Sequence, residues 1–252
     1  MKWKLPAADT FFQPFLSEEG YKIADLKDAL KQCVRFRTAV DGGAHIGTWA
    51  ATMAQRFEKV IAFEPALDTY LCLVDNVRSC SNVVTVQSAL GASAGFVAIR
   101  DDENRRGNTG AREVVLGVGD IPIVPLDSLG LADLDFLKLD VETHEFQALN
   151  GASETINRCA PLILIEVKKK HDWHNFIITH AKEMPVFELK STFGGKVACT
   201  AIPTLQSFAG GQVWSRRGFN VIGMWKPERG AINKTTGLPF AENEAMVKGC
   251  RA

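Results

Sequence analysis

Hydrophobic and polar positions follow two alternating patterns along the first half of the chain. Short apolar runs are followed by segments in which apolar residues recur every three or four positions, which is the period of a helix. Strands are predicted at 34–40, 59–63 and 83–87, and helices at 48–57 and 67–78. Strands that alternate with helices are typical of right-handed crossovers, so this order predicts an α/β, mostly parallel, doubly wound sheet.

The second half of the chain continues this pattern with more interruptions. Strands are predicted at 96–99, 136–141 and 161–167, and helices at 144–159 and 172–183. Segments 186–190 and 219–225 are expected to form an antiparallel pair at the edge of the sheet. The polar run 101–112 predicts a long loop, and long loops in compact domains often bind ligands.

Three parts of the chain differ in pattern. Residues 1–33 form an N-terminal extension with a helix at 21–33, whose apolar face holds Ile23, Leu26, Ala29 and Leu30. Residues 34–225 are expected to form one Rossmann-like domain, and 226–252 a tail of weak periodicity. Within the domain, residues 191–218 are rich in glycine and aromatic residues, which predicts an insertion that covers the substrate.

Composition narrows the partners and the compartment. The chain has 29 Lys and Arg and 29 Asp and Glu, so no global positive field attracts nucleic acid or an anionic membrane. None of the six cysteines forms a C-x-x-C pair, which is typical of reduced thiols in a cytoplasmic protein. No signal peptide or membrane-spanning stretch is expected, and the sequence leaves the oligomeric state open.

A glycine-rich turn follows the first predicted strand, in the sequence Asp41-Gly42-Gly43-Ala44-His45-Ile46-Gly47. Glycines between a strand and a helix let the backbone approach a ligand closely. The spacing is not G-x-G-x-x-G, so a dinucleotide cradle is not expected. A tight turn that serves only helix packing is the structural alternative.

An acidic residue, Glu64, ends the next predicted strand. In Rossmann-like sheets an acid at this place accepts hydrogen bonds from ribose hydroxyls, and ligands collect at the carboxyl ends of the strands. The alternative is a solvated loop residue.

Charged residues also alternate through Lys138-Leu139-Asp140-Val141-Glu142. If the strand persists, Lys138, Asp140 and Glu142 share one face, which is costly in an inner strand unless the charges are paired. One interpretation is a buried ion pair whose charges only neutralise each other, and the other is a polar functional site at the carboxyl end of the strand. With Asp41 and Glu64, these carboxylates are expected around one cleft, which suits a cationic ligand such as S-adenosylmethionine better than a phosphate chain.

Other polar residues give weaker candidates. His144 is a possible base or a surface residue at the start of a helix. Arg105, Arg106, Asn108 and Thr109, in the loop 101–112, are candidates for contacts with an acceptor, and a purely solvated loop is the alternative. Lys168–Lys170 predict a solvated face, and contact with nucleic acid or another anionic polymer is the alternative. His171 and His174 share a helix face, but no third ligand accompanies them, so no metal site is predicted.

In sequence, the chain resembles the FkbM family of methyltransferases over about residues 34–167. The resemblance rests on the glycine turn, Phe63-Glu64-Pro65, Asn76, Ala89-Leu90-Gly91, Leu126-Asp127, Lys138 to Glu142 with Glu145, and Leu149-Asn150-Gly151-Ala152. It implies a class I methyltransferase fold, S-adenosylmethionine as cofactor, and O-methylation of a sugar or natural-product hydroxyl.

The resemblance also implies roles for individual residues. The glycine turn, with Asp41, Gly42, Gly43, Ala44, His45 and Gly47, would hold the methionine part of the cofactor. Glu64 with Pro65 would hold the ribose, Ser88 and Ala89 would flank the adenine, and Asp140 and Glu142 would lie near the methyl group. Two positions depart from the family pattern, which commonly has Asn in place of His45 and Gly in place of Thr143.

Methyl transfer to a hydroxyl requires positioning and removal of a proton. Asp140 or Glu142 is the expected base, Lys138 is expected to hold one carboxylate in place, and His144 is the alternative base. Arg106, Asn108 and Thr109 are the expected contacts to a small-molecule or carbohydrate acceptor. The rival hypotheses are a nicotinamide-dependent oxidoreductase and a non-catalytic binding protein on the same fold.

Overall fold

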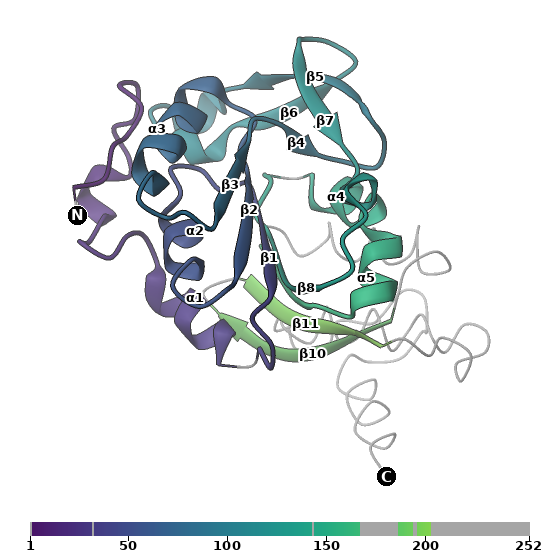
Figure 1. The fold of residues 1–252 in the computed structure, drawn as a ribbon. Coiled ribbons are helices and arrows are strands. Elements are labelled where there is room, and N and C mark those ends of the chain that lie inside the picture. Colours follow the sequence, from purple (N-terminus) through teal and green to yellow (C-terminus); the bar gives the residue numbers. More distant parts are fainter. Residues whose placement is uncertain (1, 32, 143, 167–185, 194–195, 203–252) are drawn as a thin grey trace, which may run out of the picture.

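The computed structural model of the protein describes residues 2–31, 33–142, 144–166, 186–193 and 196–202. In these residues seven strands form one sheet in the order β10-β11-β9-β8-β1-β2-β3 (Figure 1). Strands β1, β2, β3, β8 and β9 pair in parallel, whereas β11 is antiparallel to both β9 and β10. The predicted α/β, doubly wound sheet with an antiparallel strand at one edge is therefore confirmed. The strands are β1 (Thr38–Gly42), β2 (Lys59–Phe63), β3 (Val83–Val86), β8 (Leu134–Leu139), β9 (Leu162–Glu166), β10 (Val186–Phe193) and β11 (Lys196–Ile202).

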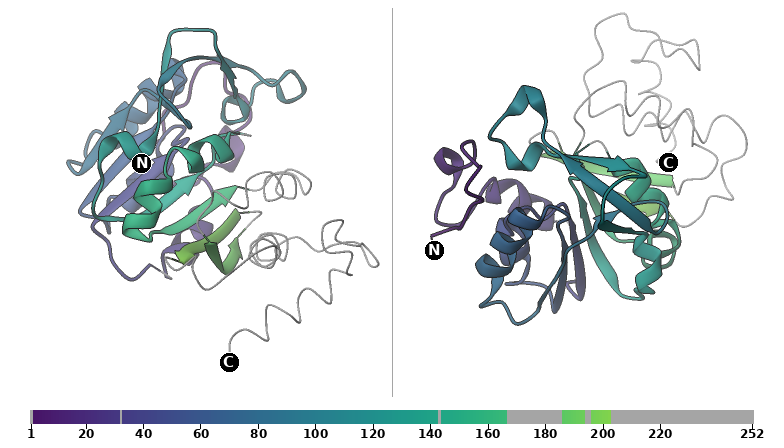
Figure 2. Two further views of the ribbon diagram at one scale, coloured as in Figure 1. Left: turned by 90° about the vertical axis from the view of Figure 1, so that its right-hand side faces the viewer. Right: turned by 90° about the horizontal axis from the view of Figure 1, so that it is seen from above.

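Helices cover both faces of this sheet (Figure 2). In β2, Val60 and Ala62 pack in one core cluster with α1, α2 and α3, whereas Ile61 and Phe63 pack in a second with α4 and α5. This alternation follows from the two-residue period of a strand, and it explains why the inner strands are apolar on both faces. The helices are α1 (Ile23–Leu30), α2 (Thr48–Met53), α3 (Leu67–Val77), α4 (Glu145–Asn150) and α5 (Ser153–Cys159).

The chain changes direction at β1. From β1 it moves outward through β2 to β3, and it later returns to place β8 on the other side of β1. Ligands of doubly wound sheets bind outside the carboxyl ends of the strands at such a switch point. The fold therefore places the turn after β1 and the residue after β2 beside the end of β8.

A second sheet of four strands, in the order β4-β7-β5-β6, lies above the ends of β1, β2 and β3 (Figure 1). Only the strand at 96–99 was predicted in this region, since the others are short. The predicted loop 101–112 joins β5 to β6 and contains two short 3₁₀ helices, η2 (Glu103–Arg105) and η3 (Thr109–Ala111). The strands are β4 (Ala89–Leu90), β5 (Gly95–Arg100), β6 (Glu113–Leu116) and β7 (Ile121–Val124).

The single helix predicted at 144–159 is wrong, because α4 and α5 are separate. The Asp127 carboxylate accepts hydrogen bonds from the backbone N–H groups of Glu154 (3.0 Å) and Thr155 (2.8 Å), which caps a new helix. A Cβ built on Gly151 would overlap the carbonyl oxygen of Gly91. The break between α4 and α5 therefore lies where the backbone of Gly151 packs against that of Gly91, just after β4, and local periodicity does not reveal this contact.

The antiparallel edge pair also differs from its prediction. β10 pairs with β11, which lies within the segment 191–218 expected to cover the substrate. The predicted strand at 219–225, the helix at 172–183 and the tail at 226–252 lie outside the described residues. β1 begins at Thr38 rather than at Val34, which is exposed.

No helix in the described part of the chain is both long and apolar enough to cross a membrane.

Candidate active site

Three strand ends meet at one edge of the large sheet. In register, Asp41 lies between Ala62 and Lys138, and Gly42 lies between Phe63 and Leu139. Beyond the strands, the backbone N–H of Asp140 donates to the carbonyl of Gly42 (3.1 Å). The turn at 41–47, Glu64 and residues 138–142 therefore form one continuous surface, which we call the floor.

Within the floor, Gly43 has no room for a side chain. Its φ is 71°, and a Cβ built on it would overlap the carbonyl oxygen of Asp140. Gly47 has a φ of 85° and stands at the start of α2. Asn76 holds the turn from α3, since its Nδ2 donates to the carbonyl of Ile46 (2.9 Å). Positive φ is accessible to glycine at low cost, and this explains the glycines at 43 and 47. Gly42 has no positive φ, but a Cβ built on it would crowd the side chains of Leu139 and Leu90.

Glu64 is a buried carboxyl that ties the turn to the end of β2. Its Oε2 accepts from the backbone N–H of His45 (2.9 Å), and its Oε1 accepts from the backbone N–H of Ala66 (3.0 Å). Burial raises the pKa of Glu64 to about 7, despite these hydrogen bonds. Each oxygen keeps a second lone pair for another donor.

A buried ion pair joins the ends of β1 and β8. Lys138 Nζ lies 2.9 Å from Asp41 Oδ1, and the two side chains are 6% and 0% exposed. Lys138 Nζ also donates to the carbonyl of Gly43 (2.6 Å). β8 ends at Leu139, so the alternation expected through Glu142 stops there, and Glu142 has a φ of 50°. The carboxylate paired with Lys138 is thus that of Asp41, on the neighbouring strand.

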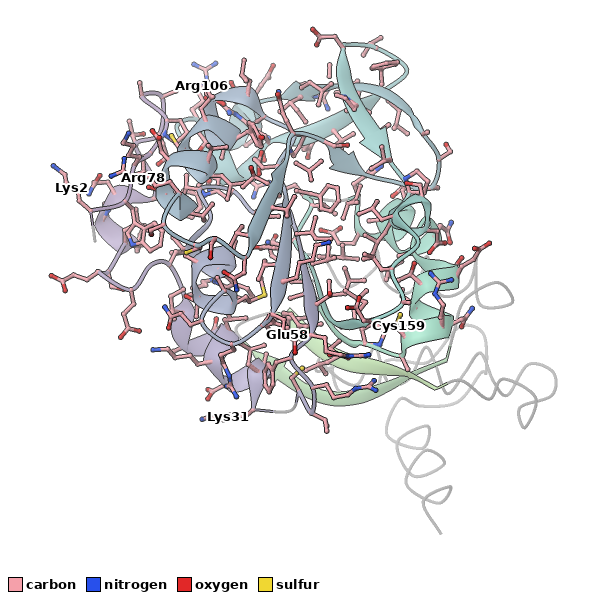
Figure 3. All side chains as sticks on the ribbon, viewed as in Figure 1. Lys2, Lys31, Glu58, Arg78, Arg106 and Cys159 are labelled. Carbon is pink, nitrogen blue, oxygen red and sulfur yellow. The ribbon has the colours of Figure 1, made fainter. Side chains whose placement is uncertain are left out.

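Two segments lie over the floor and form what we call the cover, namely residues 9–22 and 101–112. They are joined by hydrogen bonds from the backbone N–H groups of Thr10 (2.9 Å) and Phe11 (3.1 Å) to the carbonyl of Gly107. Arg105 reaches the floor, since one guanidinium nitrogen lies 3.6 Å from Glu142 Oε2. Arg106 projects from the loop at the outer edge of the molecule (Figure 3).

Two adjoining cavities lie between the floor and the cover. The larger has a volume of about 550 Å³ and is lined by aromatic residues of the N-terminal segment and of α2, by the glycine turn and by Lys138. The smaller, of about 50 Å³, is lined by Glu64 and by residues of β4, β5 and β6. The residues that line both cavities are Gly43, His45, Gly110, Asp140 and Glu142.

Most of the predicted cofactor residues line these cavities. They are Ala44 in the larger cavity, Pro65, Ser88 and Ala89 in the smaller one with Glu64, and Gly43, His45 and Asp140 in both. Asp41, Gly42 and Gly47 are not among the described residues that line either cavity. Within the floor, they hold the turn in place through the ion pair, the strand register and the start of α2.

Of the residues predicted to act in catalysis or to bind the acceptor, some line the cavities and others do not. Lys138 lines the larger cavity and Glu142 lines both, but His144 is not among the described residues that line either one. His144 is buried against Gly91, and burial lowers its pKa. Arg106 and Asn108 line the larger cavity and Thr109 the smaller. His171, His174 and Lys168–Lys170 lie outside the described residues, as does Thr143.

Several lining residues were not predicted. Phe11, Phe12 and Tyr21 come from the N-terminal extension, and Trp49 comes from the first turn of α2. The only signal for the first three was a group of aromatic residues in an irregular segment. Arg112 lines the smaller cavity while it pairs with Asp68 and Asp101. Its role depends on contacts between distant segments, which the sequence does not display.

The strand order and the position of the site define the class: the protein has the Rossmann-like class I methyltransferase fold. The methyltransferase FkbM domain pattern matches residues 41–189, which is more than half of the chain. The chain therefore belongs to the FkbM methyltransferase family, and the resemblance inferred from the motifs is confirmed.

Solved structures similar to this chain carry methyltransferase names. A methyltransferase FkbM from Methylobacillus flagellatus KT is 18% identical with a TM-score of 0.45, and the match covers 79% of this chain and 48% of that one. A Streptococcus mutans protein described as a methyltransferase, solved in complex with SAH, is 12% identical with a TM-score of 0.46, over 72% of this chain and 98% of that one. A precorrin-6y C5,15-methyltransferase from Geobacter metallireducens GS-15 is 12% identical with a TM-score of 0.45, and the match covers 81% of this chain and 100% of that one.

This chain spans about half the length of the M. flagellatus relative. No curated protein matches it.

Proposed function

We propose that the protein is an S-adenosylmethionine-dependent methyltransferase that methylates a hydroxyl group of a small-molecule or carbohydrate acceptor. The observation that carries this proposal is the convergence of Glu64, Asp140 and Glu142, from two strand ends, on two adjoining cavities beside a glycine turn. A family match over residues 41–189 supports methyl transfer.

The residues present fit the proposed cofactor. Glu64 keeps a free lone pair on each oxygen, which suits the two ribose hydroxyls. Asp140 and Glu142 line both cavities and provide negative charge for a sulfonium. Gly43, where a Cβ would overlap Asp140, gives the close backbone approach that a buried ligand requires.

The size of the smaller cavity adds a requirement. A volume of about 50 Å³ holds one or two water molecules, whereas ligand pockets usually have roughly 300–1,000 Å³. The nucleoside end of the cofactor therefore needs this cavity to enlarge when it binds. The larger cavity, of about 550 Å³, already has the volume of a ligand pocket.

The bound cofactor would supply an electrophilic methyl group. The chain itself would orient the acceptor hydroxyl in the larger cavity and accept its proton at a carboxylate of Asp140 or Glu142. Trp49 and Phe12 offer apolar surfaces to a sugar or another ring, while Asn104 and Asn108 offer hydrogen bonds to hydroxyl groups.

The test is calorimetric titration of the full chain with S-adenosylmethionine and with S-adenosylhomocysteine. Both should bind to the wild type, and Glu64→Ala should lose at least about tenfold in affinity because a hydrogen-bond partner of the ribose is removed. Glu58→Ala, at an exposed acid, is the matched control and should bind normally.

Three outcomes would contradict the proposal or its site. A folded wild type that binds neither ligand would favour the non-catalytic binding protein. Binding of a nicotinamide nucleotide instead would favour the oxidoreductase. Equal affinities of wild type and Glu64→Ala would remove Glu64 from the ribose site.

A further inference from the structure

A chain of hydrogen bonds links the cover to the floor through Asp9, Thr109 and His45. The hydroxyl of Thr109 donates to Asp9 Oδ2, and its backbone N–H donates to the same oxygen (3.1 Å). His45 Nε2 lies 2.9 Å from the hydroxyl oxygen of Thr109. These three residues are far apart in the sequence, and Asp9 precedes the segment that matches the family.

The donors and acceptors along this chain determine the tautomer of His45. A carboxylate only accepts, so the single hydroxyl proton of Thr109 is used in the bond to Asp9. The oxygen of Thr109 must then accept, and His45 Nε2 must carry a proton. Burial lowers the pKa of His45 to about 4, so the ring is neutral and its Nδ1 bears a lone pair.

The ring of His45 is held firmly at the junction of the two cavities. It lines both of them, and the ring of Phe12 packs against it at a centroid distance of 4.5 Å. The backbone N–H of the same residue donates to Glu64 (2.9 Å). In the described part of the chain, Nδ1 has no hydrogen-bond partner.

We propose that Asp9 and Thr109 are positioning residues that hold His45 in the Nε2-protonated tautomer, so that Nδ1 accepts a hydrogen bond from the ammonium group of S-adenosylmethionine. This inference rests on the proposed function. The ammonium group belongs to the methionyl part, which extends from the ribose, and the backbone of His45 already contacts the proposed ribose ligand Glu64.

The surrounding charges agree with a cation at this place. The charges that act on His45 are the negative ones of Asp9 and Asp140 and the positive ones of Lys138 and Arg112. Both positive side chains are paired with carboxylates, Lys138 with Asp41 and Arg112 with Asp68 and Asp101. A fixed lone pair directed at an ammonium forms a charge-assisted hydrogen bond, which is stronger than a neutral one. With the opposite tautomer, Nδ1–H would face the ammonium and repel it.

The affinities of two ligands test whether Thr109 positions His45 for the ammonium group. S-adenosylhomocysteine carries the ammonium group, and 5′-methylthioadenosine has the same nucleoside without it. Thr109→Val removes the hydroxyl and should weaken the binding of S-adenosylhomocysteine roughly tenfold more than that of 5′-methylthioadenosine. Thr109→Ser keeps the hydroxyl and should bind both ligands as the wild type does.

The tautomer itself is measurable by ¹⁵N NMR on the full chain. The sequence has five histidines, and His45 is identified as the signal lost in His45→Asn. The wild type should show protonated Nε2 and unprotonated Nδ1, and Thr109→Val should show a mixture of tautomers. Thr109→Ser should restore the wild-type spectrum.

Opposite results would overturn the inference in distinguishable ways. A wild-type His45 protonated at Nδ1 would contradict the tautomer. Equal weakening of both ligands by Thr109→Val, or of neither, would contradict the ammonium contact. A wild type that binds neither ligand would contradict the proposed function and the ammonium contact together, while the NMR experiment would still decide the tautomer.

Discussion

The floor and the cover of the site are held together by different kinds of interaction. In the floor, the pair of Lys138 and Asp41 is buried, with side chains 6% and 0% exposed. In the cover, the pair of Arg105 and Asp102 has side chains 40% and 15% exposed. Water screens the second pair and not the first, so the two regions are expected to differ in rigidity.

This difference suits a binding site, which must hold its ligand-binding groups in a fixed geometry and must also let the ligand enter. The floor is fixed by strand register and buried charge, so its groups keep their geometry whether or not a ligand is bound. In the described residues, the contacts between cover and floor include the hydrogen bond of Thr109 with His45, the ion pair of Arg105 with Glu142 and the ring contact of Phe12 with His45. None of these three contacts involves a strand of the sheet, so the cover is expected to open for a ligand and to close again over it, which restores them.

The largest expected effect comes from Gly43→Ala in the floor. The new Cβ would overlap the carbonyl oxygen of Asp140, at a backbone φ of 71°. We expect a loss of about 4 kcal/mol or more in the free energy of unfolding. Gly117→Ala is the matched control, since Gly117 has a φ of 76° and open space around it. It should cost only about 1–2 kcal/mol.

Urea unfolding of both variants measures this difference. Similar losses would show that backbone conformation alone, and not contact with Asp140, makes glycine necessary in the floor.

A smaller effect is expected from Lys138→Met, which leaves the buried carboxylate of Asp41 unpaired. The expected loss is about 3–5 kcal/mol in the free energy of unfolding. Lys4→Met, the same substitution at an exposed pair with Asp75, should cost at most about 1 kcal/mol. Denaturant unfolding checks both values, and a loss for Lys138→Met as small as that for Lys4→Met would contradict the assigned role of buried charge.

The smallest effect concerns pH at the boundary between floor and cover. The pKa of Glu64 is raised from 4.5 to about 7, so its stabilising contribution is full below pH 4.5 and is lost as pH rises to 7. The pKa of His45 is lowered from 6.5 to about 4, so its contribution is full above pH 6.5 and is lost as pH falls to 4. Between these values the trends of Glu64 and His45 oppose each other.

His45→Asn removes one of the two trends. Relative to the wild type, the free energy of unfolding of this variant should fall by roughly 2 kcal/mol more between about pH 5 and pH 7, because His45 no longer opposes Glu64. Unfolding measured at several pH values checks this, and a variant with the same pH dependence as the wild type would refute the opposition of the two groups.

The sequence alone determined the parallel strands of the large sheet, their alternation with helices along the chain, and the floor of the site. Alternating apolar runs and helical periods predict β1, β2, β3, β8 and β9 because burial on both faces requires apolar side chains throughout each strand. The positions of Gly43, Glu64 and Asp140 follow from this order, since the carboxyl ends of neighbouring parallel strands meet at one edge.

Only the tertiary structure decided the partner of Lys138, the break between α4 and α5, and the whole cover. Lys138 pairs with Asp41 because register places the two side chains opposite each other on neighbouring strands. Asp9, Thr109 and His45 meet because two irregular segments fold over the sheet. Periodicity records which residues are buried within an element, whereas contacts between distant irregular segments leave no period in the sequence.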